Sequence, residues 1–247
     1  VNNLSAILFV SHYLKDSFIR DLPEKELCAD AYSKCIVIPN EVTRTSKARP
    51  EKKKKILLAG RMVPEKGILE ACEAAAKILP AFPEWHLDIV GSTHFHAAKP
   101  SEYEQKITRT LAPIATQTTQ HGYLQETDLS KLQAQAAIAL VPSLWQEPAG
   151  LTVIEALAYG CALFTTDKGG IPEIARGRAE IAPIRELDYR DENNRQAIIT
   201  ILAANLHSLL SDNNKLARLQ DRAWKDYPFD ARNMAVNADN YRISLKS

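Results

Sequence analysis

The stretch Gln146–Gly160, QEPAGLTVIEALAYG, decides the fold class. It begins as a loop with Pro and Gly and continues as an apolar segment of helical period. It ends at Gly160, in the position after a helix that favours a left-handed backbone. The strand-like run Ile138–Val141 stands shortly before it. A buried strand, a loop and a helix in this order predict a unit of a parallel sheet.

The same alternation of short apolar runs and helical segments extends over most of the chain. Strands are expected at Ala6–Val10, Ile36–Ile38, Lys55–Ala59, His86–Val90, Thr118–His121, Ile138–Val141, Ala162–Thr165 and Glu180–Ala182. Helices are expected at Tyr13–Arg20, Ile68–Leu79, Ser101–Ala115, Thr127–Ala136, Leu151–Tyr159, near Ile171, and at Ala197–Leu210 and Asn213–Lys225. The pattern predicts an α/β fold, a Rossmann-like doubly wound parallel sheet with C-terminal closing helices.

A polar connection, NEVTRTSKARPEKKKK (Asn40–Lys55), separates the first β-α unit from the rest. We expect residues 1–50 to form a crossing segment and linker, and residues 51–247 to form the Rossmann-like domain with its closing helices. The run Lys52–Lys55 is interpreted as a solvated loop. The chain does not begin with Met, which suggests a fragment of a longer protein.

The charge balance, the apolar runs and the cysteines indicate which partners and which cellular compartment are expected. The 31 Lys and Arg residues balance 30 Asp and Glu residues, which argues against a nucleic-acid partner. No apolar run is long enough for a membrane span, and the first residues lack a signal peptide. The four cysteines show no CxxC pairing. Three of them lie in apolar helix or strand patterns and predict buried, reduced thiols in a cytoplasmic protein, although Cys28 and Cys35 could pair.

The first candidate site lies in LLAGRMVPEKG (Leu57–Gly67), a strand that ends at Gly60 and is followed by a loop that opens a helix. In open α/β sheets, ligands bind beyond the carboxyl ends of the strands. Arg61 offers a fork of donors and Lys66 a mobile charge, so the two could neutralise a diphosphate. Two solvated cations on a loop remain an equal alternative.

The second candidate site is the opening stretch itself. The N–H groups at Gly150, Leu151 and Thr152 begin a helix and could hold a phosphate. Glu155 lies in a largely apolar helix, where a buried carboxylate needs partners, and a vicinal diol such as ribose would suit it. Glu147 lies on the loop, either as a surface acid or as a carboxylate beside a sugar.

Two further patterns are weaker. The run TTDKGGIPE (Thr165–Glu173) is a strand, a Gly-rich turn and a helix start, and its paired glycines suit either close approach to a ligand or a tight turn. His94 and His96 are two residues apart on an expected loop, where a surface position is more common than a metal site.

Together these motifs resemble the C-terminal domain of family 4 retaining glycosyltransferases of the GT-B fold. The resemblance rests on Gly60-Arg61 with Glu65-Lys66-Gly67, on PSLWQEPAGLTVIEALAYG and on GGIPE, in that order. Val10-Ser11 and Ile38-Pro39-Asn40 resemble the family's crossing between domains. The sequence departs from the family pattern at Ala149, where Phe or Cys is frequent, and at Glu41, where Gly is frequent.

The resemblance implies a role for each matching residue. Arg61 and Lys66 would contact the donor diphosphate and Glu147 the donor sugar, which makes these three the catalytic candidates. The donor-binding candidates are Gly60, Gly150, Leu151, Thr152 and Glu155, with Glu155 on the ribose. The base would lie, more loosely, near Gly91 and Tyr123–Leu124.

The implied activity is transfer of a sugar from a UDP- or GDP-linked donor to an acceptor hydroxyl with retention, without a metal or other cofactor. The resemblance also implies bacterial polysaccharide or lipopolysaccharide synthesis, a saccharide or glycolipid acceptor, and an N-terminal acceptor domain that these residues lack. The Lys52–Lys55 run and the helix Tyr13–Arg20 could touch a membrane surface. The alternatives are a nucleotide-sugar-binding domain without activity, an epimerase or hydrolase of the same fold, and a phosphorylase, for which no pyridoxal-phosphate lysine is evident.

Overall fold

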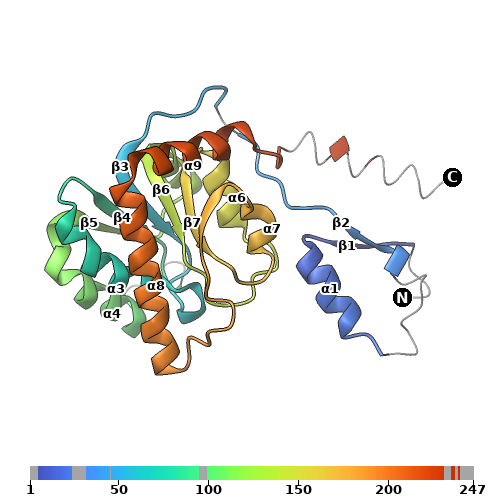
Figure 1. Cartoon of the computed structure of the whole chain (residues 1–247), viewed down its shortest axis with the longest axis horizontal. Helices are drawn as coiled ribbons and strands as arrows, with labels where there is room; N and C mark the ends of the chain where they lie inside the picture. The colour runs from blue at the N-terminus through green and yellow to red at the C-terminus, as the bar shows by residue number, and fades with distance from the viewer. Residues whose placement is uncertain are drawn as a thin grey trace.

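The computed structural model describes residues 5–23, 32–44, 46–94, 99–230, 235–236 and 239. Its main body is a parallel sheet with the strand order β5-β4-β3-β6-β7-β8 (Figure 1). The strands are β3 (Lys53–Ala59), β4 (His86–Val90), β5 (Thr118–Gly122), β6 (Ala136–Val141), β7 (Ala162–Thr166) and β8 (Ala179–Ala182). Every neighbouring pair is parallel. The chain winds outward from β3 in one direction and from β6 in the other, which confirms the doubly wound sheet.

Helices cover both faces of this sheet. On one face, α3 (Ile68–Ile78), α4 (Glu102–Leu111) and α8 (Glu192–Ser211) enclose a core that contains Ile56, Leu58 and Ile89. On the other face, α5 (Glu126–Gln135), α6 (Leu151–Ala158) and α7 (Ile171–Ala175) pack over a second core that contains Leu57 and Leu163. Alternate residues of β3 after Lys55 therefore enter different cores, which explains why this half of the strand is apolar without a polar face.

A small second unit lies beside the main body and is called the crossing unit here. It consists of β1 (Ile7–Phe9), α1 (His12–Arg20) and β2 (Cys35–Val37), and its two strands are parallel. Phe9 packs against Phe18 with ring centroids 5.2 Å apart. Figure 1 shows the unit at the end of a long connection, next to α7. Leu8 is 62% exposed, so this sheet lacks a closed core of its own.

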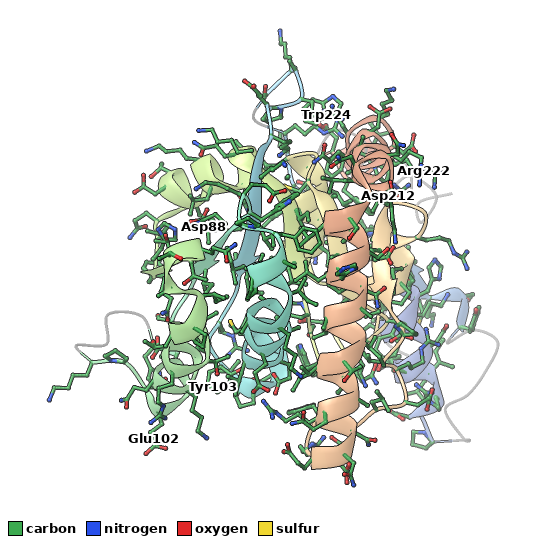
Figure 2. All side chains as sticks on the ribbon, turned by 60° about the vertical axis from the view of Figure 1, so that its left-hand side comes forward. Asp88, Glu102, Tyr103, Asp212, Arg222 and Trp224 are labelled. Atoms are coloured by element: carbon green, nitrogen blue, oxygen red, sulfur yellow. The ribbon has the colours of Figure 1, made fainter. Side chains whose placement is uncertain are left out.

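Helix α9 (Asn213–Lys225) closes the main body at the beginnings of β6 and β8. The carboxylate of Asp212 accepts from the Lys215 N–H at 2.8 Å and begins α9, and Figure 2 labels this residue at the junction with α8. Gln220 Nε2 of α9 donates to Ala137 O at 3.0 Å. At the end of α9, the guanidinium of Arg44 lies 4.1 Å from the centre of the Trp224 ring. The linker is thus held against the closing helix.

Element boundaries agree with the sequence expectations to within two residues in most cases. One difference is the helix expected at Ser101–Ala115, which ends at Leu111 and continues as the 3-10 turn Ala112–Gln117. Pro113 lies in this turn and cannot donate an N–H to a longer α-helix. The other is α8, which begins at Glu192, five residues before the expected start, because Asp191 accepts from the Asn194 N–H at 2.9 Å.

The interpretation of Lys52–Lys55 as a solvated loop was wrong. Lys53, Lys54 and Lys55 begin β3, where the Lys55 amino group lies 2.8 Å from Asp88. Lys52 Nζ donates to Ala134 O at 3.0 Å and to Gln133 O at 3.2 Å, at the end of α5. The central position of β3 in the sheet gives these cations partners that the charge run alone does not reveal.

Cys35, Cys72 and Cys161 are buried, and the last two are free thiols. Burial raises the pKa of the Cys161 thiol, and the nearby Lys52 ammonium offsets part of this rise. Cys28 lies outside the described residues, so its pairing stays a prediction. Among the described helices, none combines the length and apolar character that a membrane crossing requires.

Candidate donor site

A cleft of about 460 Å³ opens where the chain direction reverses between β3 and β6. At such a switch point the loops beyond two neighbouring strands diverge and leave space for a ligand. The lining includes three charged side chains, namely Arg61, Lys66 and Glu147. It is completed by Val10, Asn40, Ala59, Gly60, Ile68, Val141, Pro142, Ser143, Pro148, Ala149, Gly150, Leu151 and Thr152. The candidate residues of both motifs therefore meet in one cleft, apart from Glu155.

Lys66 and Glu147, which both line the cleft, form an ion pair. The Glu147 side chain is 9% exposed, and its carboxylate also accepts from Ser143 Oγ at 2.9 Å. The Lys66 ammonium lies 5.3 Å from the centre of the Trp145 ring. Glu147 is thus a buried carboxylate whose Oε1 contacts both Lys66 and Ser143, and it is not the surface acid of the alternative interpretation.

The ion pair depends on close approach of two loops. The 3-10 turn Pro64–Lys66 ends at Gly67, whose φ of 68° suits glycine. A Cβ atom on Gly67 would lie 2.1 Å from Pro142 O, so a side chain there has no room. Leu144 N donates to Glu65 O at 2.9 Å and fastens the same two loops. Lys66 reaches Glu147 because Gly67 lets its loop touch the loop after β6.

Arg61 differs from Lys66 in having no tight partner among the described residues. Its side chain is 58% exposed, and its nearest carboxylate, Glu65, is 3.9 Å away. A guanidinium in this position keeps most of its donors available for an anion that enters the cleft. Two cations and one carboxylate leave the charged lining with an excess of positive charge.

The start of α6 faces the same cleft. Gly150 precedes the helix with a φ of 69°, and Leu151 and Thr152 form its first turn. The first N–H groups of a helix have no carbonyl partner inside it and carry the positive end of its dipole. This end of α6 is therefore suited to a phosphate.

Glu155 lies one turn into α6, outside the cleft lining. Its carboxylate accepts from Gln133 Nε2 of α5 at 3.4 Å. Burial raises the pKa of Glu155, the Gln133 hydrogen bond offsets part of this rise, and the charge of Glu126 adds to it. The carboxylate is thus poorly compensated, as a group awaiting a hydroxyl partner would be.

The glycines of GGIPE approach the protein's own backbone. Gly170 N donates to Glu147 O at 2.7 Å, and Gly169 N donates to Gln146 Oε1 at 2.7 Å. A Cβ atom on Gly169 would lie 2.2 Å from Glu147 O. This turn therefore supports the loop that carries Glu147. The paired glycines are explained by this contact, so they do not require a ligand close to the turn.

The histidine pair and the loops expected to bind the base receive little support from the structure. His94 is exposed, and His96 lies outside the described residues. Within the described part of the chain, no cluster of three or more His, Cys, Asp or Glu side chains has the geometry of a metal site. Gly91 N donates to Gly122 O at 2.8 Å, which places the loops after β4 and β5 side by side. Base binding near Gly91 and Tyr123–Leu124 stays a prediction.

Several site residues were not expected from the sequence. Ser143 is a partner of Glu147, and a hydroxyl four residues before the glutamate was an available signal. Gln133 is a partner of Glu155 but lies 22 residues away, so only the fold reveals it. Val10 and Asn40 line the cleft from the crossing unit and the segment after it, in motifs that had been associated only with a domain crossing.

Comparison with known proteins supports this description at the level of family. The family model described as glycosyl transferases group 1 matches residues 39–182, which contain the whole cleft lining except Val10. A putative glycosyltransferase, YtcC, of Bacillus subtilis is 28% identical over 189 residues, 71% of this chain and 46% of the relative. The lipopolysaccharide 1,2-N-acetylglucosaminetransferase of Salmonella typhimurium is 26% identical over 180 residues, 70% of this chain and 46% of the relative. The chain spans about half the length of these relatives.

Solved structures agree in fold. Anabaena Alr3699/HepE, crystallised with UDP and glucose, has a TM-score of 0.74 at 17% identity, with 97% of this chain and 63% of that chain covered. Sucrose-phosphate synthase from Thermosynechococcus elongatus has a TM-score of 0.70 at 20% identity, with 98% and 59% covered. The sheet and its flanking helices match those of GT-B glycosyltransferases. The chain belongs to the group 1 glycosyltransferase family.

Proposed function

We propose that this chain is the nucleotide-sugar-binding half of a retaining glycosyltransferase. The observation that carries the proposal is the convergence of Arg61, Lys66, Glu147 and the start of α6 in one cleft at the switch point of the sheet. Two cations and a helix start suit a diphosphate, and a carboxylate beside them suits sugar hydroxyls. Glu155, further along the same helix, would hold the ribose.

The proposed chemistry is the departure of a nucleoside diphosphate from the sugar. Negative charge grows on the diphosphate as the glycosidic bond breaks toward an oxocarbenium-like state. Arg61, Lys66 and the α6 dipole would stabilise this charge electrostatically, without a metal ion. Glu147 would position the donor sugar, and the leaving phosphate would accept the proton of the acceptor hydroxyl.

The nucleotide and the biological role are proposed from relatives. HepE was crystallised with UDP and glucose, which favours a UDP-linked donor, with GDP as the alternative. The Salmonella relative acts on lipopolysaccharide by name, which favours a polysaccharide or lipopolysaccharide acceptor. We place the acceptor site in a domain outside these residues and the enzyme in the cytoplasm, with contact at the membrane surface as a further proposal.

Calorimetry tests the donor site directly. The chain is titrated with UDP, GDP, ADP and UMP, and we expect a nucleoside diphosphate to bind more tightly than the monophosphate. Glu155→Gln should weaken the binding of every nucleotide that carries ribose. If none of the four nucleotides releases or absorbs heat, and none shifts the melting temperature, the proposal is wrong.

A second candidate is a nucleotide-sugar-binding domain without activity of its own, which the span of about half of each relative favours. An acceptor assay separates the two. Transfer by a longer protein but not by these 247 residues supports a donor half that needs its partner domain. Release of free sugar without any acceptor would indicate a hydrolase, and a changed donor sugar would indicate an epimerase.

A further inference from the structure

The crossing unit touches the donor loops at the start of α1. Ser11 caps this helix: its Oγ accepts from Leu14 N at 3.1 Å and donates to Pro148 O, directly after Glu147. Ser11 is only 2% exposed. Gly170 lies against it, since a Cβ atom on Gly170 would be 3.0 Å from the Ser11 hydroxyl. One buried hydroxyl thus joins the crossing unit to the loop that carries the sugar-positioning candidate.

Glu173 makes the second connection. Its two carboxylate oxygens accept from the backbone N–H groups of His12 at 2.8 Å and Tyr13 at 2.5 Å. These groups belong to the first turn of α1, where N–H groups lack partners within the helix and the dipole is positive. A carboxylate 160 residues away in the chain therefore supplies the cap that α1 cannot make from its own acidic residues, since its first turn has none.

The contact has a consequence for the cleft. Val10, directly before Ser11, and Asn40, shortly after β2, line the same cleft as the start of α6. The described residues between β2 and β3 have no regular secondary structure and are held to the main body at α9, as in the contact of Arg44 with Trp224 (Figure 1). The contacts of α1 are therefore a separate attachment of the crossing unit. Glu173 is solvent exposed, and an exposed hydrogen-bonded contact of this kind is modest in strength and reversible.

We propose that Glu173 and Ser11 are positioning residues of the donor site, which fasten α1 to the donor loops and so hold Val10 and Asn40 against the cleft. The inference rests on the proposed function for its donor, but the contact itself is independent of it. Donor binding and attachment of α1 stabilise each other, because each orders the loop at Glu147 and Pro148. Glu173 acts through α1 and has no role on the reacting atoms.

Amide hydrogen exchange on the full chain tests the contact. In Glu173→Ala, the His12 and Tyr13 amides should exchange about tenfold faster, the effect of losing about 1.4 kcal/mol of hydrogen bonding. Glu173→Gln keeps one acceptor oxygen, so its exchange rates should lie between those of the wild type and those of Glu173→Ala. Glu102→Gln is the control, because Glu102 is an exposed first-turn glutamate of α4 on the opposite flank (Figure 2).

Saturating UDP provides the readout that a purely structural contact would not change. In the wild type, UDP should slow exchange at His12 and Tyr13 further, whereas in Glu173→Ala it should not, and UDP should bind about fivefold more weakly. Ser11→Ala should act in the same direction, and melting temperatures establish that each variant is folded.

The outcomes are distinguishable. If wild-type His12 and Tyr13 amides exchange as fast as those of Glu173→Ala, the contact is absent and the inference is wrong. Equal UDP affinity with and without Glu173, or UDP protection that persists in Glu173→Ala, contradicts the positioning role and leaves the proposed function intact. A wild-type chain that binds neither UDP nor GDP contradicts the proposed function instead.

Discussion

Lys66 neutralises a carboxylate that is nearly inaccessible to water. Replacement by Met keeps much of the side-chain volume but leaves Glu147 with Ser143 as its remaining side-chain partner. Because an unpaired buried charge is costly, we expect Lys66→Met to lower the free energy of unfolding by about 2 kcal/mol. We expect it to weaken UDP binding by tenfold or more. Urea unfolding and calorimetry measure the two effects.

Lys54→Met is the matched control. Its ammonium pairs with Glu84 at 3.0 Å, but both side chains are about half exposed. Solvent screening makes such a pair nearly neutral for stability, so we expect no resolvable change in the free energy of unfolding. Equal losses in the two variants would contradict the special position of Glu147. In a double-mutant cycle, Glu147→Gln should restore much of the stability that Lys66→Met loses.

We expect the Glu155 carboxylate to favour nucleotide binding and to lower the stability of the folded chain. Burial raises the pKa of its carboxyl in the folded chain above the unfolded value, so the folded state binds its proton more tightly. The resulting stabilisation is complete below the unfolded pKa, near 4.5, and is lost as the pH rises through the folded pKa. The ionised carboxylate is therefore only partly compensated by its hydrogen bond from Gln133, and Glu155→Gln removes its charge.

We expect Glu155→Gln to raise the free energy of unfolding at pH 7 by about 1 kcal/mol, a typical cost of an underpaired buried polar group. The gain should shrink as the pH falls toward 5, and nucleotide affinity should drop at every pH. Thermal unfolding between pH 5 and pH 8 measures the difference. A variant that is less stable than the wild type at pH 7 would show that Gln133 compensates the charge fully.

At the scale of elements, the turn Pro64–Lys66 delivers Lys66 to the cleft through the contact at Gly67. Gly67→Ala places a Cβ atom 2.1 Å from Pro142 O, and this backbone atom cannot move without disturbing β6. We expect Gly67→Ala to lower the free energy of unfolding by about 3 kcal/mol, because the strain of a positive φ adds to a steric clash. The loop shift should also separate Lys66 from Glu147 and weaken UDP binding.

Gly177→Ala separates these two causes. Gly177 has a φ of 72°, close to that of Gly67, but a Cβ atom there meets nothing within 4 Å. Gly177→Ala should lower the free energy of unfolding only by the backbone strain, about 1 kcal/mol, and should leave UDP affinity unchanged. Urea midpoints of the two variants give the comparison. If both lose the same stability, the contact with Pro142 does not constrain the turn.

How much the sequence predicts depends on the distance over which a feature is determined. Strands, helices and the phosphate-suited start of α6 follow from local periodicity and from Gly150, so they were predicted. The partners of the carboxylates were not, because Gln133 and Glu155 meet only when α5 and α6 pack on the same face of the sheet. The contact from Glu173 to α1 spans 160 residues and leaves no local pattern.

At the scale of the whole molecule, two sheets of very different size share one chain. The main sheet is buried between two helical layers, and its central strands β3 and β6 contain the fully buried residues Ile56 and Ile138. The crossing unit has a two-stranded sheet with Leu8 exposed, and such a sheet has little stability of its own. Cooperative unfolding of both parts together is therefore not expected.

Native-state hydrogen exchange under mild urea should resolve these two parts. Ile7 N donates to Lys34 O and Ile38 N to Phe9 O, each at 2.8 Å, so these amides report opening of the crossing unit. We expect them to exchange through an opening at least about 2 kcal/mol less costly than the opening that exposes Ile56 and Ile138. The difference follows from buried apolar area, which is small beside β1 and large around β3. If all four amides exchange only at the global free energy of unfolding, the crossing unit is an integral part of the main fold, and its attachment is far stronger than the polar contacts at the start of α1 explain.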